Sequence, residues 1–109
     1  MTRRDMLIGS GAVALLPLLG GRALAAPRTH TAVMANMRFG PLPPGLKVGD
    51  VILWVNRDVV PHTATARDGS FNVDIPARQS RRMTVRRAGT FAFYCRYHPA
   101  MRGTLVAAR

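Results

Sequence analysis

The sequence reads GTFAFYCRYHPAMRG over residues 89–103, and this stretch holds the only cysteine of the chain. Its first half is rich in apolar and aromatic residues and follows a turn, which predicts a β-strand over residues 90–95. Successive side chains of a strand point to opposite faces, so if Cys95 points into the core, Phe91 and Phe93 do too. Taken alone, the cysteine would be interpreted as a small buried core residue.

The second half of the stretch places a thiol, an imidazole and a thioether at positions i, i+3 and i+6, as Cys95, His98 and Met101. Thiolate and thioether are soft ligands and imidazole is intermediate, so the set suits copper in either oxidation state. Zinc more usually takes several cysteines or histidines, or carboxylates.

A second histidine, His62, lies upstream in Pro61-His62-Thr63, at the start of another predicted strand. Two histidines and a cysteine in a trigonal plane, with a weak axial methionine, form an electron-transfer copper site. We therefore predict four copper ligands: His62, Cys95, His98 and Met101.

Strand patterns dominate residues 26–109, and no stretch of useful length shows the helical period. Turn residues such as Asp68-Gly69 separate the apolar runs. No repeat, low-complexity tract or second domain is visible. The sequence predicts a small all-β sandwich or barrel of six or seven strands, those recognised being 29–37, 51–55, 62–66, 82–85, 90–95 and 103–107.

Several other residues have simpler interpretations. His30 has no evident partner, and we expect it to be solvated. Asn56 is expected either to brace the loop that carries His62 or to be an ordinary turn residue. Five large apolar residues are expected in the core: Met34, Met37, Phe39, Trp54 and Met83.

Residues 1–25 have the three parts of an export signal. Arg3 and Arg4 form a charged head, residues 6–19 are mostly apolar, and Ala23-Leu24-Ala25 supplies a small-x-small cleavage pattern. The paired arginines also resemble the twin-arginine signal, which implies a bacterial periplasm. An uncleaved anchor is the alternative, but the apolar stretch is shorter than the roughly 20 residues of a membrane span.

The chain carries a formal net charge of +11. Residues 1–25 contribute three arginines and one aspartate, a net +2, so residues 26–109 retain +9. The arginines are scattered and no nucleic-acid-binding motif is present, so nucleic acid is not the expected partner. We expect a monomer whose redox partners have an acidic docking surface.

The sequence resembles the cupredoxins, and within them the plastocyanin and amicyanin group. Gly49-Asp50-Val51, Trp54-Val55-Asn56 and Pro61-His62-Thr63 are similar to the first half of that pattern, and residues 89–95, His98-Pro99 and Met101-Arg102-Gly103 to the second. The resemblance spans essentially all of residues 26–109. It implies a Greek-key β-sandwich, a blue-copper site and the same four ligands, with the short loop between His98 and Met101 that amicyanin has.

One position departs from the group pattern. Plastocyanin and amicyanin carry an asparagine after the first ligand histidine, whereas this chain has Thr63. In the group that residue ties the two ligand-bearing loops together and tunes the sulfur. The resemblance therefore leaves the reduction potential open.

The resemblance implies a type 1 copper protein that carries single electrons between partners. The ligand set leaves no open position for a substrate, so an enzyme is not expected. A periplasmic copper-binding or trafficking protein is the alternative. Multicopper oxidases need further histidine-rich copper sites, and three histidines in the whole chain exclude that class.

Overall fold

The computed structural model describes residues 26–109, and the predicted export signal lies outside the described residues. The described part is all-β, as predicted. It contains no helix long and apolar enough to cross a membrane. Its nine strands are β2 (Thr29–Ala35), β3 (Arg38–Phe39), β4 (Leu46–Lys47), β5 (Val51–Asn56), β6 (His62–Ala66), β7 (Asn72–Ile75), β8 (Ser80–Thr84), β9 (Gly89–Tyr94) and β10 (Arg102–Ala108).

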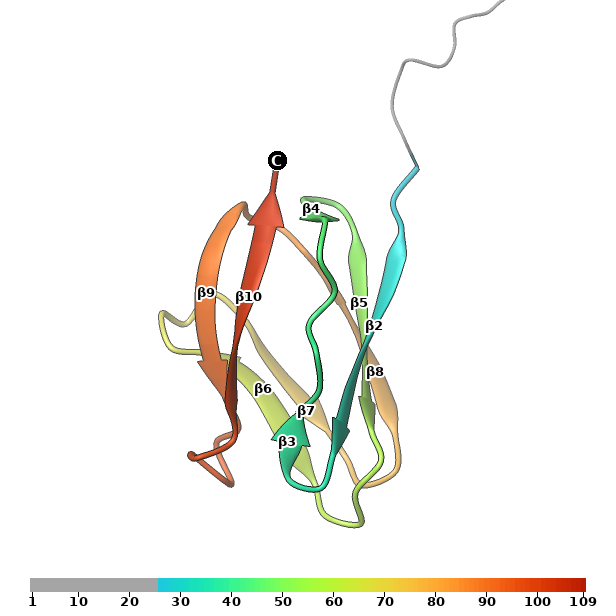
Figure 1. Cartoon of the computed structure of the whole chain (residues 1–109), viewed down its shortest axis with the longest axis vertical. Coiled ribbons are helices and arrows are strands. Elements are labelled where there is room, and N and C mark those ends of the chain that lie inside the picture. Colours follow the sequence, from blue (N-terminus) through green and yellow to red (C-terminus); the bar gives the residue numbers. More distant parts are fainter. Residues whose placement is uncertain (1–25) are drawn as a thin grey trace, which may run out of the picture.

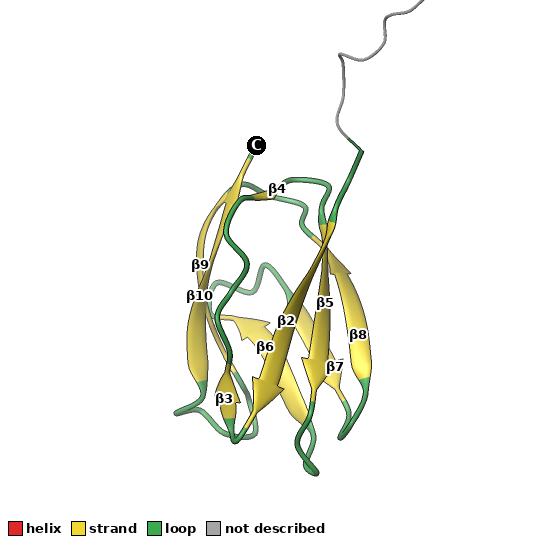
Figure 2. Ribbon diagram, turned by 45° about the vertical axis from the view of Figure 1, so that its right-hand side comes forward, coloured by secondary structure: helices red, strands yellow, loops and turns green. Residues whose placement is uncertain are grey.

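The strands form two sheets that pack face to face (Figure 1). One sheet has the order β4-β10-β9-β6-β7 and the other β3-β2-β5-β8. The chain changes sheet on entering and leaving the short strand β4, between β5 and β6, between β7 and β8, and between β8 and β9, so the crossovers of a Greek-key sandwich are present. Figure 2 shows β9 and β10 in one layer, β2, β5 and β8 in the other, and the connecting loops at the two ends.

The core lies between the two sheets and follows the period of two that the sequence predicts. Phe91 and Phe93 of β9 are buried, and Cys95, just beyond the strand, continues the inward row with no exposed surface. Trp54 of β5 meets Phe93 edge to face, with ring centroids 5.5 Å apart. Phe39 contacts both rings edge to face, with its centroid 4.7 Å from that of Phe93 and 6.1 Å from that of Trp54. These contacts fix the strand that leads to the cysteine.

Gly103 allows β10 to lie close against this row. It pairs with Phe93 across the sheet, and a Cβ atom at this position would lie 2.7 Å from the Phe93 ring. Any side chain here would push the ring out of place, because packed interiors leave no slack for a further carbon.

Asp50 fastens the start of β5 to the first described strand. Its buried carboxylate accepts the backbone N–H groups of Arg28 and Lys47 and contacts His30 Nε2 at 3.0 Å. The pKa of Asp50 lies below its usual range, first because of the Arg28 N–H and then because of the His30 ring. Hydrogen bonds from N–H groups to a carboxylate stabilise its ionised form and so lower its pKa.

Three expectations from the sequence differ from the structure. His30 is not solvated, since its side chain is 12% exposed and bonded to Asp50. Met37 is not in the core, because β2 ends at Ala35 and Met37 lies in a turn with φ 61°. Three strands were not predicted, namely β3, β4 and β7, since they are only two to four residues long.

Candidate metal centre

The segment from Cys95 to Met101 folds as two successive turns. The His98 N–H donates to the Cys95 carbonyl at 3.2 Å, and the Met101 N–H donates to the His98 carbonyl at 2.8 Å. The Cys95 N–H closes the loop on the Met101 carbonyl at 2.9 Å. Each turn joins residues that are three apart in the sequence, so the first turn links Cys95 to His98 and the second links His98 to Met101. The spacing of these three predicted ligands thus matches the local backbone structure.

His62 opens β6 and is fully buried, as is Cys95. Its Nδ1 lies 3.8 Å from the sulfur of Cys95. Metal–sulfur and metal–nitrogen bonds of about 2.3 and 2.0 Å, meeting at about 120°, would hold the two atoms about 3.7 Å apart. The distance equally suits a weak S–H···N hydrogen bond. The two atoms are therefore close enough to bind one metal ion together.

Asp58 sets the orientation of the His62 ring. Its carboxylate lies 2.7 Å from His62 Nε2 and also accepts the N–H groups of Asn36 and Met37. The pKa of Asp58 is held below its usual value, first by the His62 hydrogen bond and then by the Met37 N–H. An ionised carboxylate only accepts, so Nε2 carries the hydrogen and donates it. In the neutral ring, Nδ1 then presents its lone pair toward Cys95.

Asn56 braces this arrangement, which decides between the two roles considered for it. Its buried amide nitrogen donates to the carbonyls of Val60 and Ile75 at 2.9 and 3.1 Å. Its oxygen accepts the N–H of Asp58 at 2.9 Å. One side chain thus joins the loop before His62 to the end of β7 and holds Asp58 in position.

Thr63 ties the ligand loop to β6. Its backbone N–H points at the sulfur of Cys95 at 3.3 Å, and its hydroxyl oxygen accepts the N–H of Arg96 at 2.9 Å. The link between the two loops, which the plastocyanin and amicyanin group makes with an asparagine, is made here by a threonine.

The other two predicted ligands, His98 and Met101, differ from each other in exposure. The His98 ring is partly exposed and meets the His62 ring edge to face, with centroids 5.3 Å apart. Met101 is buried at 4% exposure. Among residues 26–109, no three His, Cys, Asp or Glu side chains are grouped tightly enough to form a ready-made metal site. The structure brings together the pairs Cys95–His62 and His62–His98, and the four-ligand set remains a prediction.

The surface around this end of the sandwich is apolar at several points. Tyr97 in the ligand loop is 52% exposed, Val59 is 74% exposed, and Met37 is 41% exposed. Arg96, which follows Cys95 in the ligand loop, pairs with Asp74 of β7 at 2.7 Å, and both side chains remain exposed. Its charge is partly compensated, since an exposed pair of this kind screens both partners.

Asp58 was missed in the sequence, although an aspartate four residues before a predicted ligand histidine is a usable signal. Metal-bound histidines commonly donate their second ring N–H to a carboxylate. Pro61 and the buried Asn56 fix the short connection between them.

A family model described as Cupredoxin-like domain matches residues 10–107. Amicyanin from Paracoccus denitrificans is 30% identical over 79 residues, covering 67% of this chain and 60% of the relative. Amicyanin from Paracoccus versutus is 30% identical over 67 residues, covering 56% and 51%. The chain thus spans about half to three fifths of the length of these curated relatives.

Solved structures agree with the sequence relatives. The crystal structure of amicyanin from Paracoccus versutus has a TM-score of 0.61 at 26% identity, covering 72% of this chain and 80% of that one. A mutant amicyanin in the Cu(I) form has a TM-score of 0.62 at 28% identity, covering 72% and 81%. Together with the family match and the two-sheet fold, these relatives show that the chain belongs to the cupredoxin-like family, in the amicyanin group.

Proposed function

We propose that the chain binds one copper ion through His62 Nδ1, Cys95 Sγ, the His98 ring and Met101 Sδ, and that it carries single electrons between partner proteins. The observation that supports this most directly is the Cys95–His62 pair, 3.8 Å apart with the far ring nitrogen held by Asp58. The name of the relatives and the Cu(I) form of one solved neighbour support the choice of metal. Bound copper would supply a one-electron couple.

The residues of the chain would keep that site rigid and dry. His62, Cys95 and Met101 are buried, and the hydrogen bonds of Asp58, Asn56 and Thr63 hold two of them in place. A site that changes little between two oxidation states loses little energy to rearrangement. His98 is the predicted ligand that reaches the surface, so electrons would enter or leave there.

The test is to add copper(II) to the purified protein and record its visible spectrum. A thiolate–copper(II) bond in such a site gives the intense colour of blue copper proteins. Cys95→Ser should abolish the colour and keep the fold, and the matched control Ser80→Ala on β8 should keep both. A colourless copper(II) complex of the unaltered protein would contradict the electron-carrier proposal.

The rate of metal release distinguishes a copper-trafficking protein from an electron carrier. A buried site should hold copper against a weak external chelator, whereas a protein built for handover should release it within seconds. Rapid loss of the blue colour on addition of the chelator would favour trafficking over electron transfer.

We further propose periplasmic export by the twin-arginine route and docking on an acidic redox partner. The paired arginines and residues 23–25 support the first part, and the net charge of +9 with the exposed Tyr97 and Val59 supports the second. Arg4→Lys together with Arg3→Lys should block export, seen by cell fractionation. Electron transfer to an acidic redox protein should slow as salt rises, because steering is screened.

A further inference from the structure

A cavity of about 400 Å³ opens between the two sheets, away from the predicted ligands. It lies where the edge strand β7 of one sheet meets the edge strand β8 of the other, and its floor is made by β9 and β10. Ligand pockets commonly have volumes from roughly 300 Å³ upward. The space is also far larger than the roughly 10–15 Å³ that a single water needs. It is therefore of a size to hold a small organic molecule.

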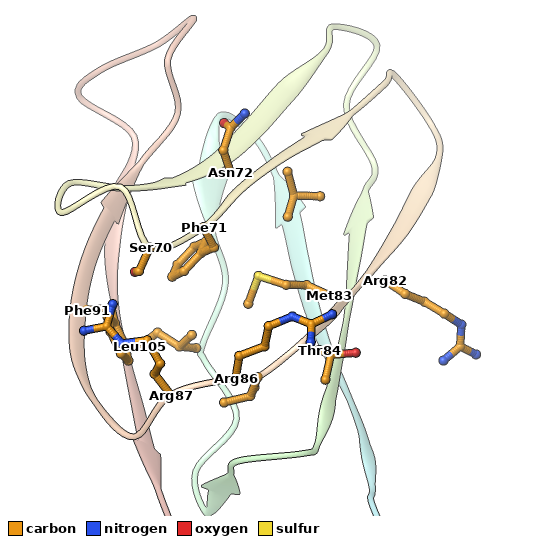
Figure 3. Close-up of a pocket in the computed structure, with 12 residues that line it drawn as sticks. Ser70, Phe71, Asn72, Arg82, Met83, Thr84, Arg86, Arg87, Phe91 and Leu105 are labelled. Carbon is orange, nitrogen blue, oxygen red and sulfur yellow. The ribbon is translucent and has the colours of Figure 1, made fainter.

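The inner wall of the cavity is apolar. Phe71 and Met83 lie at its sides, and the buried residues Phe91 and Leu105 lie at its base. Figure 3 shows the Phe71 ring and the Met83 side chain directed into the space. Methionine and phenylalanine side chains adapt well to a ligand with a flexible apolar chain.

The rim of the cavity is cationic. Arg86 reaches along the cavity beside Met83, and Arg87 lies beside Phe91 with its guanidinium 5.8 Å from the ring centroid (Figure 3). Arg82 points away from the space in the same view. None of the residues that line the cavity is acidic. Guanidinium groups bind carboxylates in a bidentate manner, which selects an anion over a neutral molecule of the same size.

Ser70 adds one polar group to this arrangement. Ser70 lines the cavity, and its backbone N–H donates to the Asp68 carboxylate at 2.8 Å. The pKa of Asp68 lies below its usual range, first because of the Ser70 hydroxyl, and the charge of Arg87 lowers it further. The Ser70 side chain is therefore turned toward Asp68, and an exposed carboxylate lies close to the Arg87 end of the rim.

From the apolar interior, the two guanidinium groups and the absence of lining acids, we infer that the cavity between β7 and β8 binds a small amphipathic anion, a carboxylate on an apolar chain. The apolar chain would lie against Phe71, Met83 and Phe91, and the carboxylate would meet Arg86 and Arg87. This site does not depend on copper binding.

The test compares three probes by NMR titration of the ¹⁵N-labelled protein, with decanoate kept below its critical micelle concentration and decanol below its solubility limit. Decanoate should bind saturably and shift the amide signals of residues 70–73, 83–87 and 105. Decanol has the same chain without the charge and should bind at least tenfold more weakly, and acetate has the charge without the chain and should not bind. Equal affinity for decanoate and decanol, or shifts that map away from these residues, would overturn the proposal.

Variants locate the charge that selects the anion. Arg86→Gln with Arg87→Gln should weaken decanoate binding about tenfold and leave decanol binding unchanged. Arg81→Gln is the matched control, because Arg81 lies on β8, the strand that leads to Arg86 and Arg87, and bonds to Gln79 and the Ser80 carbonyl outside the cavity. A double variant that binds decanoate as the unaltered protein does would contradict the assignment. The three probes decide the question on the unaltered protein even if the double variant does not fold.

Discussion

The molecule contains two aspartate–histidine pairs of nearly the same construction, one at each end of β5. Asp50 accepts two backbone N–H groups and contacts His30 at 3.0 Å, and Asp58 accepts two backbone N–H groups and contacts His62 at 2.7 Å. The first pair fastens β2 to the start of β5. The second does the same kind of fastening for the turn after β2 and the loop before β6.

The two pairs differ in what the other ring nitrogen faces. His62 Nδ1 faces the buried sulfur of Cys95, whereas no hydrogen bond or sulfur contact is found for His30 Nδ1 among residues 26–109. His62 is also fully buried, and His30 is partly exposed. An aspartate–histidine pair is thus a bracing unit in both places, and only a soft ligand beside the second nitrogen makes it part of a metal centre.

Replacing each histidine in turn should give the largest difference between the two aspartate–histidine pairs. His62→Ala should cost about 2–4 kcal/mol of unfolding free energy, because it leaves a cavity and deprives the partly buried Asp58 of its donor. His30→Ala should cost about 1 kcal/mol, the value of one partly exposed hydrogen bond. Urea unfolding without copper measures both, and copper colour should be lost in the first variant only. Equal losses of stability would show that burial does not distinguish the pairs.

Asn56→Ala should have the next largest effect, because Asn56 braces the Asp58 end and has no counterpart at the Asp50 end. The change leaves the buried carbonyl of Ile75 and the N–H of Asp58 without their present partners. We expect a loss of about 2–3 kcal/mol in urea unfolding. Asn72→Ala on β7 is the control, since Asn72 is exposed and should change stability by less than about 1 kcal/mol.

Thr63→Val tests the tie between β6 and the ligand loop. The new side chain has nearly the same shape but no hydroxyl to accept the Arg96 N–H. We expect a loss of about 1 kcal/mol and a measurable change in the reduction potential of the copper-loaded protein. Thr104→Val, an exposed threonine on β10, should change neither quantity. An unchanged potential in Thr63→Val would show that the tie is structural only.

The smallest effect is expected in the pH dependence of stability at the Asp50 end. The pKa of Asp50 is lowered by folding, so its contribution is fully present well above the ordinary value of 3.8 and is lost as the pH falls below that value toward the folded pKa. Asp50→Asn should therefore flatten the rise in thermal stability between acid and neutral pH. Asp74→Asn, an exposed carboxylate on β7, is the control. A slope unchanged by Asp50→Asn would contradict this assignment.

Much of the fold was accessible from the sequence because the relevant signals are local. The period of two in residues 91–95 correctly predicted which side chains face the core, since alternation follows from strand geometry alone. Met37 was misassigned because it is apolar and closely follows the apolar run of residues 32–35, yet the positive φ of Asn36 and Met37 turns the chain. A backbone reversal held by a distant aspartate leaves little trace in local sequence.

For the predicted metal site too, some features follow from local sequence and others from the tertiary structure. The sequence by itself determined the chemical types available for a metal and the spacing from Cys95 to Met101, which two short turns satisfy within seven residues. Only the tertiary structure decided that His62 lies beside Cys95, that Asp58 orients its ring, and that Thr63 receives the Arg96 N–H. It also decided that β7 and β8 leave a cationic cavity between them. These contacts join residues from different strands, so they depend on strand order and register, which backbone periodicity does not specify.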